Sequence, residues 1–336
     1  MADLPERTAA AWIDRPGPVD AIRVGELPLP AVGSGEALVR VEAVAVNAVD
    51  TLVRSGAYPT PMSFPFVIGR DLAGTVVAVP DDGSAGGFAE GDRVWCNSMG
   101  HDGRPGAAAE YVAVPVERLY PLPEQTDAVT AVAVVHPAAT AHLALFTHGR
   151  LRSTDTVFVA GAAGNVGAAA VRMASAAGAR VIASAGRPDL EYCRSLGASL
   201  ALDYHAPDLA ERIRAAAPDG VDVYMDTSGR NDLTTAVELL AVRGRILVLA
   251  GLGRADGDPP LPVGPLYTKD ASVLGFVISR ARTTELAAAA ERVNELLSAG
   301  MLSPRRIELL PLSAAAEAHR RVESGEAHGI RLVLRP

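Results

Sequence analysis

Short apolar runs separated by glycine and proline fill the N-terminal part of the chain. The runs predicted to be strands are residues 37–46, 72–79, 93–96 and 111–114. Glycine-rich stretches at 81–91 and 100–106 predict exposed loops, because glycine and small polar residues cannot supply a packed core. This part of the chain is predicted to be a compact, mostly β domain.

From Thr154 onward the pattern changes to short apolar runs that alternate with alanine-rich helical segments. The runs are residues 157–160, 181–183, 221–225, 246–250 and 273–278. Strands without polar alternation are buried on both faces, which is typical of a parallel sheet covered by crossover helices. The predicted fold class is therefore α/β, with a doubly wound parallel sheet of the Rossmann type.

The C-terminal part predicts a helix from Thr283 to Gly300, a strand at 305–310, a helix from Ser313 and a final strand at 330–334. We expect this tail to return to the first domain. The most apolar stretch, residues 128–146, approaches membrane-spanning length. It contains His136, Pro137 and His142, which are unfavourable in hydrocarbon, so it is predicted to be a buried helix that connects the domains.

Composition supports a folded protein and excludes several classes of partner. With 336 residues, 49% of them hydrophobic and 21% charged, the chain is long enough for two domains. A net charge of −8 without clustered Lys and Arg argues against nucleic acid. Two cysteines, Cys96 and Cys193, cannot form a disulfide framework, and the N-terminus lacks a basic and apolar leader, so we expect a cytoplasmic protein in a reducing compartment.

The most informative motif runs from Val157 to Gly167 and joins a predicted strand to an alanine-rich helix. Its glycines are spaced GxxGxxG, with Ala162 where the usual fingerprint has its first glycine. Gly164 would let the backbone approach a pyrophosphate, and the helix N-terminus would offer it N–H groups. A tight turn without a ligand is the alternative, but the position at the first strand of the βαβ series favours dinucleotide binding.

The end of the next strand bears on the choice of dinucleotide. NAD enzymes place a carboxylate about 20 residues after the glycines, to bind the ribose hydroxyls. Here Ser184 and Arg187 stand there, and Arg187 could bind a 2′-phosphate through charge-assisted hydrogen bonds. The sequence favours NADPH; a solvated loop arginine, with Asp189 serving NAD, is the alternative.

Several motifs together resemble one protein family. They are Val46-Asn47-Ala48-Val49-Asp50-Thr51 with Arg54-Ser55-Gly56, Gly69-Arg70-Asp71-Leu72-Ala73-Gly74, Gly91-Asp92-Arg93-Val94, the glycine turn, Leu274-Gly275-Phe276-Val277-Ile278 and Gly329-Ile330-Arg331. Over nearly its whole length the chain resembles the medium-chain dehydrogenase/reductases, in their zinc-free quinone oxidoreductase, or zeta-crystallin-like, branch. The resemblance implies a GroES-like catalytic domain at 1–125, completed by 282–336, and a Rossmann NADPH-binding domain at 126–281.

The zinc ligands of the zinc-dependent relatives are replaced in this chain. Asn47, Arg70 and His136 stand where those relatives have Cys, His and Cys. Only His136 is a suitable ligand, because Asn binds zinc poorly and Arg does not lose its proton. The relatives' four-cysteine lobe is also missing, so we expect neither a catalytic nor a structural zinc ion.

The resemblance also implies cofactor-binding residues. For the pyrophosphate these are Gly161, Ala163, Gly164, Asn165, Val166 and Gly167; for the adenosine phosphate, Ser184, Arg187 and Tyr204; past the fourth strand, Thr227 and Ser228; near the nicotinamide, Asn47, Thr140, Ala250, Gly251, Phe276 and Val277; and Arg331 as a basic residue near the cofactor.

The implied activity is hydride transfer from NADPH to a quinone or similar electron-poor carbonyl acceptor, without zinc. Asn47, Arg70 and Tyr58 are candidate catalytic residues that could donate hydrogen bonds to the acceptor, and Tyr58 could equally be a packing residue. Leu52 replaces a tyrosine that is common in the branch, which predicts a more apolar pocket.

Three other functions remain open from sequence. The main alternative is reduction of the C=C bond of an enone or acyl thioester, which needs a proton source. Alcohol dehydrogenation is disfavoured because no Lewis acid would activate the alcohol. A non-catalytic NADPH-binding sensor or structural protein is the alternative from another class. The family also implies a homodimer that pairs edge strands near residues 273–278.

Overall fold

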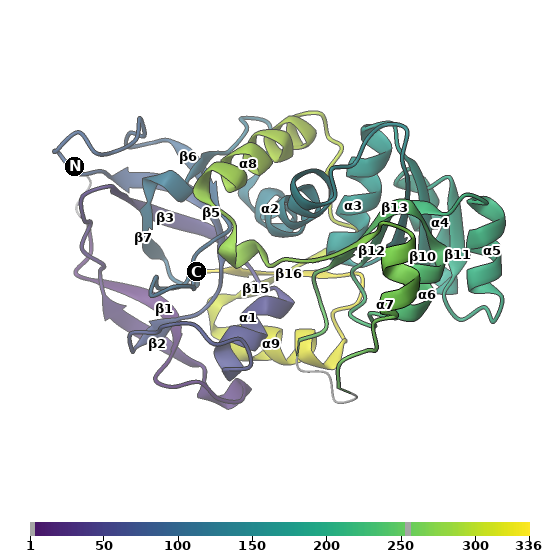
Figure 1. The fold of residues 1–336 in the computed structure, drawn as a ribbon. Coiled ribbons are helices and arrows are strands. Elements are labelled where there is room, and N and C mark those ends of the chain that lie inside the picture. The colour runs from purple at the N-terminus through teal and green to yellow at the C-terminus, as the bar shows by residue number, and fades with distance from the viewer. Residues whose placement is uncertain (1–3, 253–256) are drawn as a thin grey trace. The chain divides into compact units, whose positions relative to one another are not determined.

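A computed structural model describes residues 4–252 and 257–336 and divides them into two compact units. The first unit contains the described residues up to His136 together with Arg282–Pro336, and the second contains those within Pro137–Ala281. Figure 1 labels elements of both units where there is room. The two units are described separately.

Among the described residues, the strands of the first unit form a mixed sheet and a small antiparallel sheet. The mixed sheet has the order β15-β16-β3-β5-β6-β8, with β7 paired to β3, and the small sheet has the order β2-β1-β4. The strands are β1 (Arg7–Ile13), β2 (Arg23–Pro28), β3 (Glu36–Ala45), β4 (Phe66–Val67), β5 (Asp71–Ala78), β6 (Arg93–Cys96), β7 (Tyr111–Pro115), β8 (Tyr120–Pro121), β15 (Ile307–Pro311) and β16 (Arg331–Arg335). Apolar side chains from both sheets form one buried cluster, which includes Ile13, Val39, Phe66 and Leu72.

The C-terminal tail belongs to the first unit, as the sequence led us to expect. β16 pairs antiparallel with β3, where Val333 lies opposite Ala45, and parallel with β15. Chain segments far apart in the sequence therefore share one sheet, which places the start of β16 next to the end of β3.

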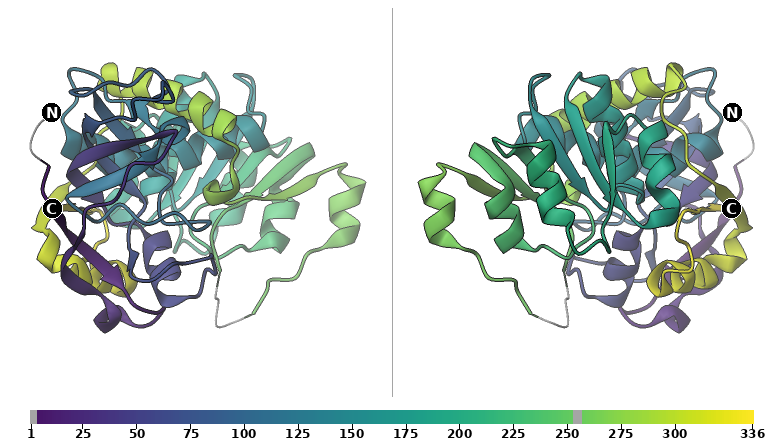
Figure 2. Two further views of the ribbon diagram at one scale, coloured as in Figure 1. Left: turned by 90° about the vertical axis from the view of Figure 1, so that its left-hand side faces the viewer. Right: turned by 90° about the vertical axis from the view of Figure 1, so that its right-hand side faces the viewer.

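The strands of the second unit form a parallel sheet. Its order is β11-β10-β9-β12-β13-β14, and every printed pairing is parallel. The strands are β9 (Thr156–Ala160), β10 (Arg180–Ala185), β11 (Leu200–Asp203), β12 (Val221–Asp226), β13 (Leu240–Val248) and β14 (Ser272–Gly275), and Figure 2 shows them side by side. The order reverses between β10 and β12 on either side of β9, so the predicted doubly wound α/β fold is confirmed.

Helices cover the parallel sheet. They are α3 (Asn165–Ala176), α4 (Leu190–Ser195), α5 (Leu209–Ala216), α6 (Leu233–Leu239) and α7 (Val263–Thr268). The helix α3 contacts β9 and β10, whereas α6 contacts β13. Right-handed crossovers place the helices that precede β10 and β11 on one face and those that precede β12 and β13 on the other, because the winding direction reverses.

Two predictions for the second unit needed correction. The strand Leu200–Asp203 was missed, because four residues reading LALD give little periodicity and few β-branched side chains. The strand predicted at 273–278 ends at Gly275, and Ile278–Arg280 form a 3₁₀ helix.

The first unit also contains helices that flank its sheets. They are α1 (Ala48–Ser55), α8 (Thr283–Ser298), α9 (Ala315–Ser324) and the start of α2 (Ala128–His142).

Short helical segments of other types occur in both units. In the first unit, 3₁₀ helices occur at Val19–Ala21, Val116–Arg118 and Leu312–Ala314. In the second unit, 3₁₀ helices occur at Arg187–Asp189 and Ile278–Arg280, and a π-helical segment, Leu143–His148, follows α2.

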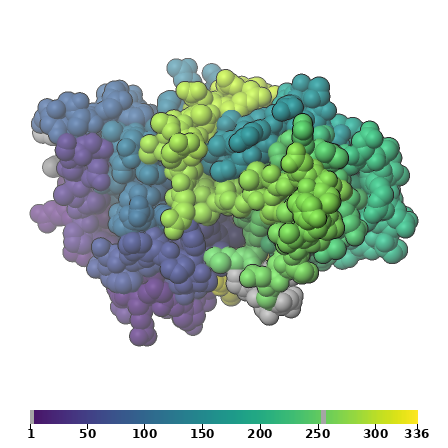
Figure 3. Space-filling view, in the orientation of Figure 1, coloured from purple at the N-terminus to yellow at the C-terminus, as the bar shows by residue number. Residues whose placement is uncertain are grey.

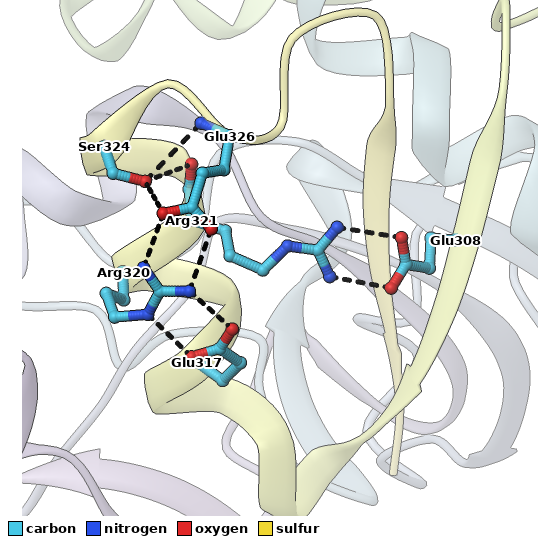
Figure 4. Close-up of polar contacts among 6 residues, drawn as sticks. All are labelled: Glu308, Glu317, Arg320, Arg321, Ser324 and Glu326. Carbon is cyan, nitrogen blue, oxygen red and sulfur yellow. Dashed lines mark hydrogen bonds and ion pairs between the residues drawn. The ribbon is translucent and has the colours of Figure 1, made fainter.

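The helix α9 is tied to β15 by a bidentate ion pair. Arg321 donates from both terminal nitrogens to the carboxylate of Glu308, at 2.7 and 2.8 Å, while Arg320 bonds Glu317 and Glu326 on the outer side of the helix (Figure 4). Arg320 binds Glu317 three residues before it on the helix, a spacing at which side chains face each other.

The apolar helix predicted at 128–146 is present and largely buried. The continuous helical stretch Ala128–His148 is long and apolar enough to cross a membrane, but 78% of its apolar window is buried inside the protein. A buried core helix meets the same criteria of length and composition, so this stretch is weak evidence for a membrane span.

Candidate functional site

The predicted dinucleotide turn is a tight strand-to-helix connection between β9 and α3. Gly161 has φ +74°, a conformation that side chains rarely adopt. A Cβ added to Gly167 would lie 2.2 Å from the carbonyl oxygen of Gly161, so only glycine allows the helix to pack this closely. Gly164 is the N-cap of α3 and makes no side-chain cap.

This geometry fits a dinucleotide pyrophosphate. The helix α3 is 12 residues long and starts at Asn165, so the N–H groups of its first turn have no intrahelical acceptors. Ala163, Asn165 and Val166 stand at this end of the helix, where the positive end of the helix dipole favours phosphate oxygens. The turn therefore has the conformation that the sequence motif predicts.

Several of the residues predicted to bind the cofactor meet around this turn. The hydroxyl of Thr227 donates to the carbonyl oxygens of Ala160, at 2.7 Å, and of Gly161, at 3.1 Å. Ser228 follows it, and the backbone of Gly251 lies close to Gly229 in the same loop region. The carboxyl ends of β9, β12 and β13 thus bring these residues to one edge of the sheet.

The residues predicted to read the adenosine phosphate lie after β10 and β11. Arg187 is exposed, and its Nε lies 3.4 Å from a carboxylate oxygen of Asp203. Tyr204 follows β11 and is 38% exposed. Ser184 is only 2% exposed, and Asp189, the alternative ribose ligand, is 6% exposed. Of these four residues, Arg187 and Tyr204 are therefore the exposed ones.

Other predicted cofactor residues lie elsewhere in the second unit. Phe276 stacks on His148, with 4.6 Å between ring centroids, and Val277 follows it. Thr140 lies in α2 and is 7% exposed. Ala250 follows β13, and its carbonyl oxygen accepts a hydrogen bond from Asn231 at 2.8 Å.

The first unit contains a buried polar cluster, composed of Asn47, Asp50, Asp71, His136 and Arg331. These residues come from the N-cap and first turn of α1, the start of β5, the helix α2 and the start of β16. All five are at most 7% exposed. The sequence singled out Asn47 and Arg331, but not the two carboxylates, and it considered His136 only as a possible zinc ligand.

Asp71 is the centre of this cluster. One carboxylate oxygen accepts Nδ2 of Asn47 at 2.7 Å, and the other lies 3.0 Å from Nδ1 of His136. The second carboxylate, Asp50, accepts the backbone N–H of Asn47 at 2.7 Å and its Nδ2 at 3.3 Å. Both amide hydrogens of Asn47 are therefore engaged by carboxylates.

The ionisation of Asp50 is shifted by its buried surroundings. Burial, and then repulsion by Asp71, raise the pKa of Asp50 to about 6, although the N–H of Asn47 and the charge of Arg70 oppose the shift. Arg331 donates to the carbonyl oxygen of Ala133 at 2.7 Å and to the amide oxygen of Asn47 at 2.9 Å. Arg331 is therefore held within this cluster, where it helps to orient Asn47.

Arg70 is the most unusual side chain in the first unit. It is 1% exposed, yet its Nε, Nη1 and Nη2 have no hydrogen-bond partner among the described residues. Burial lowers the pKa of Arg70, and the neighbouring charges of Asp50 and Asp71 oppose this shift. The guanidinium is thus compensated by charge but lacks hydrogen-bond acceptors.

Tyr58, the third candidate catalytic residue, packs against His101. Their rings are stacked with centroids 5.6 Å apart, and the tyrosine hydroxyl lies 3.4 Å from Nε2 of His101. Tyr58 is half-buried against the apolar cluster of this unit, and its hydroxyl contributes to the electrostatic environment of Arg70.

Comparisons with known proteins identify the family. The alcohol dehydrogenase GroES-like domain matches residues 33–124, and the zinc-binding dehydrogenase family matches residues 165–295. A quinone oxidoreductase from Mus musculus is 30% identical over 312 residues, which cover 91% of each chain. The chain belongs to the medium-chain dehydrogenase/reductase superfamily. Its similarity to quinone oxidoreductases supports the zeta-crystallin-like branch, so the resemblance noted in the motifs is confirmed.

Further relatives show the range of this superfamily. A prostaglandin reductase-3 from Mus musculus is 30% identical over 285 residues, covering 82% of this chain and 73% of that protein. A mycobacterial protein solved in complex with NADPH is 27% identical, with a TM-score of 0.84 over 98% of this chain and all of that one. This medium-chain reductase is thus an oxidoreductase that uses a nicotinamide cofactor, and its fold includes a GroES-like domain.

The zinc named in the family description does not fit this member. Among residues 4–252 and 257–336, no group of three or more His, Cys, Asp or Glu side chains could hold a metal ion. Asn47, Arg70 and His136, the three residues that the resemblance places at the relatives' zinc-ligand positions, supply an amide, a guanidinium and an imidazole, and only the imidazole is a suitable zinc ligand. The imidazole of His136 is bonded to Asp71.

Sequence reasoning missed Asp50, Asp71 and His136 as a group. A weak signal was present, because Asp71 opens an otherwise apolar strand and His136 interrupts an apolar helix. A charged residue within a buried element is usually paired, so each implies a partner. The sequence did not reveal that the two residues pair with each other.

Proposed function

We propose that this medium-chain reductase uses NADPH to reduce a quinone or a similar electron-poor carbonyl acceptor, and that Arg70 binds the acceptor oxygen. When bound, the nicotinamide supplies the hydride. The observation that carries the proposal is the buried guanidinium of Arg70, whose three nitrogens lack acceptors among the described residues.

An acceptor with a carbonyl oxygen would satisfy that guanidinium. A buried polar group without a hydrogen-bond partner costs about 1–3 kcal/mol, and a charged group costs more. A carbonyl oxygen on the ligand would offset this cost, and the hydrogen bonds would strengthen as negative charge developed on the oxygen. Arg70 would therefore assist the step in which the acceptor is reduced.

Asn47 and Tyr58 take different parts in this proposal. Both amide hydrogens of Asn47 already bond the carboxylates of Asp50 and Asp71, so Asn47 mainly holds the polar cluster in place. It can donate to the acceptor only if one of these two hydrogen bonds breaks. Tyr58 can donate its hydroxyl proton to the acceptor, and its stacking on His101 fixes the ring. We rank Arg70 first as the donor, ahead of Tyr58 and Asn47.

The second unit is proposed to bind NADPH rather than NADH. The pyrophosphate would lie at the Gly161–Gly167 turn, next to Ala163, Asn165 and Val166, and the 2′-phosphate beside Arg187 and Tyr204. We predict that Arg187→Ala weakens NADPH binding and leaves NADH binding nearly unchanged, because only NADPH carries that phosphate. Equal losses for both dinucleotides, or better turnover with NADH in the unaltered protein, would contradict this assignment.

Reduction of a C=C bond is the second candidate function. The similarity to prostaglandin reductase-3 favours it, and the same donors could polarise the carbonyl group of an enone. Paired quinones and enones of graded size separate the two functions in an NADPH-oxidation assay. Turnover of the enones alone would select the second candidate, and NADPH binding without turnover of either would indicate a non-catalytic protein.

Arg70 can be tested against a matched buried arginine. Arg54 is also 1% exposed, but its guanidinium bonds Gly17 and Glu323. We expect Arg70→Met to lower kcat/KM for the acceptor by at least 100-fold while NADPH affinity is kept, since a lost charged hydrogen bond in a buried site costs about 3 kcal/mol. Arg54→Met should affect stability and leave kcat/KM of the folded enzyme nearly unchanged. Unaltered kinetics in Arg70→Met would overturn the proposal.

A homodimer is proposed through the edge of the parallel sheet. Among the described residues β14 pairs only with β13, and α7 nearby exposes Val263 and Tyr267, at 61% and 72%. The helix α7 faces the viewer in Figure 3. Sedimentation velocity of the unaltered protein and of Tyr267→Glu tests this, and a monomer at micromolar concentration in the unaltered protein would exclude it.

The compartment is proposed to be the cytoplasm. Cys96 and Cys193 are both buried, and two cysteines cannot make a disulfide framework, as suits a reducing compartment. The proposed catalytic domain, at 1–125 and 282–336, and the proposed NADPH-binding domain, at 126–281, would then act on a small-molecule acceptor drawn from that compartment.

A further inference from the structure

Hydrogen bonds fix the backbone of the loop after β12, which carries Arg230. Asp226 ends β12 and is 3% exposed. Its carboxylate accepts the backbone N–H groups of Ser228, Gly229 and Asn231, at 2.7, 3.2 and 2.7 Å. These three hydrogen bonds fix the backbone of the loop on both sides of Arg230.

The same loop is fastened on both sides. Thr227 bonds the carbonyl oxygens of Ala160 and Gly161, so the loop begins against the glycine turn. Asn231 donates Nδ2 to the carbonyl oxygen of Ala250, so the loop ends against the chain that follows β13. A side chain carried by such a loop is preorganised, which lowers the entropy lost when it binds a ligand.

Arg230 reaches Tyr204 across the edge of the sheet. Its guanidinium carbon lies 5.2 Å from the centroid of the tyrosine ring, within the range of a cation–π contact. Tyr204 follows β11 and Arg230 follows β12, and the order β11-β10-β9-β12 separates these strands by three spacings, or about 14 Å. The two side chains therefore meet over the carboxyl ends of β9 and β10.

This contact stands beside the proposed phosphate site. A Cβ added to Gly186 would lie 3.8 Å from the ring of Tyr204, so the tyrosine flanks the residue before Arg187. Arg187 forms an ion pair with Asp203, in which Nε lies 3.4 Å from a carboxylate oxygen. A 2′-phosphate carries more than one negative charge, so one arginine that is already paired with a carboxylate compensates it incompletely.

We infer that Arg230, stacked on Tyr204, is a second residue that selects NADPH by binding its 2′-phosphate together with Arg187. This inference rests on the proposed function, which assigns NADPH to the second unit. Stacking uses the flat face of the guanidinium, and its N–H groups lie in the plane of that face, where they can bond phosphate oxygens. NADH lacks the phosphate, so its binding gains nothing from Arg230.

Equilibrium binding of NADPH and NADH, followed by calorimetry without any acceptor, tests the inference. Arg230→Ala should raise the Kd for NADPH at least 10-fold and change that for NADH less than twofold. Arg230→Lys, which keeps the charge but not the planar donors, should fall between the two. Tyr204→Phe keeps the stacking face and should retain most of the NADPH affinity, whereas Tyr204→Leu should lose part of it.

Arg212 provides the matched control, because it is an exposed arginine on α5 in the same unit. Arg212→Ala should leave both dissociation constants unchanged. If the ratio of NADPH affinity to NADH affinity in Arg230→Ala stays within twofold of that in the unaltered protein, the inference about Arg230 is overturned. The proposed use of NADPH would not be affected by that result. An unaltered protein that prefers NADH would instead overturn the proposed cofactor, and the role of Arg230 with it.

The dependence on salt gives a second readout. If Arg230 contacts the phosphate, the slope of log Kd against log salt concentration for NADPH should become shallower in Arg230→Ala, because one ionic contact is lost. The slope for NADH should not change. Equal slopes for NADPH in the two proteins would count against a direct contact.

Discussion

Nδ1 of His136 lies 3.0 Å from a carboxylate oxygen of Asp71, and both side chains are buried. We expect Nδ1 to donate in this pair, because a carboxylate oxygen is a hydrogen-bond acceptor. The other oxygen of Asp71 accepts Asn47, so one carboxylate fixes two of the three residues that replace the relatives' zinc ligands. Asp71 thus holds together two residues that the resemblance places at the zinc-ligand positions of those relatives.

Replacing Asp71 by asparagine should disrupt this arrangement. An amide offers one acceptor oxygen where two donors require one each, so a buried donor is left unsatisfied, at a cost of about 3 kcal/mol in the free energy of unfolding. Urea denaturation of Asp71→Asn measures the loss. Asp92→Asn is the control, because Asp92 is exposed and accepts a single backbone hydrogen bond from Ala89.

The tautomer of His136 gives an independent test of the same pair. Nitrogen-15 spectra of histidine-labelled protein should show the Nδ1–H form for the resonance that disappears in His136→Gln. An Nε2–H form in the unaltered protein would mean that Asp71 does not accept a hydrogen bond from this ring.

His319 should make the protein sensitive to acid. It is 1% exposed, and burial, with a smaller effect of Arg54, lowers its pKa from 6.5 to about 3. The unfolded chain therefore binds a proton below pH 6.5 that the folded protein does not bind, so stability is present above pH 6.5 and falls as the pH drops toward 3. At pH 5 the loss is about 2 kcal/mol relative to pH 7.

His319→Leu should remove this contribution. The free energy of unfolding of the variant should fall about 2 kcal/mol less than that of the unaltered protein between pH 7 and pH 5, as measured by urea denaturation at both values. The comparison uses the difference between the proteins, because other groups titrate in both. Parallel pH profiles would show that His319 is protonated as readily in the folded protein as in the unfolded one.

Gly167→Ala should damage the glycine turn. The added Cβ would meet the carbonyl oxygen of Gly161 at 2.2 Å and Cα of Ala162 at 2.8 Å, and both are backbone atoms that cannot move alone. We expect a lower melting temperature and at least a 10-fold weaker affinity for NADPH, because α3 must shift away from the phosphate site. Gly264→Ala on α7 is the control, since a Cβ there meets no atom within 4 Å.

Removal of metal should not affect this reductase. Dialysis against a strong chelator, followed by assay with and without added zinc, should leave kcat/KM unchanged, because among the described residues no set of three His, Cys, Asp or Glu ligands is assembled. Activity that is lost on dialysis and restored by zinc would show that a metal is bound after all.

The sequence determined much of the fold on its own. Apolar runs such as 157–160 and 221–225 predicted strands of a parallel sheet, and the structure confirms them as β9 and β12. The motif at Gly161–Gly167 predicted the strand-to-helix turn, because glycine is favoured locally where φ is positive and where two backbones come close. These features depend on periodicity and on backbone sterics, both of which are properties of a short segment.

Tertiary structure decided what the sequence left open. β11 is too short to show a period, and it forms where β10 offers a partner. Asp71 meets His136, and Arg331 meets Asn47, because β5 and β16 both pair with β3 while α2 packs beside them. Arg230 meets Tyr204 because the parallel strands β11 and β12 end at the same edge of the sheet. These contacts follow from the order and register of the strands, which are set by the burial of apolar surface between distant segments. A local pattern of residues therefore cannot predict them.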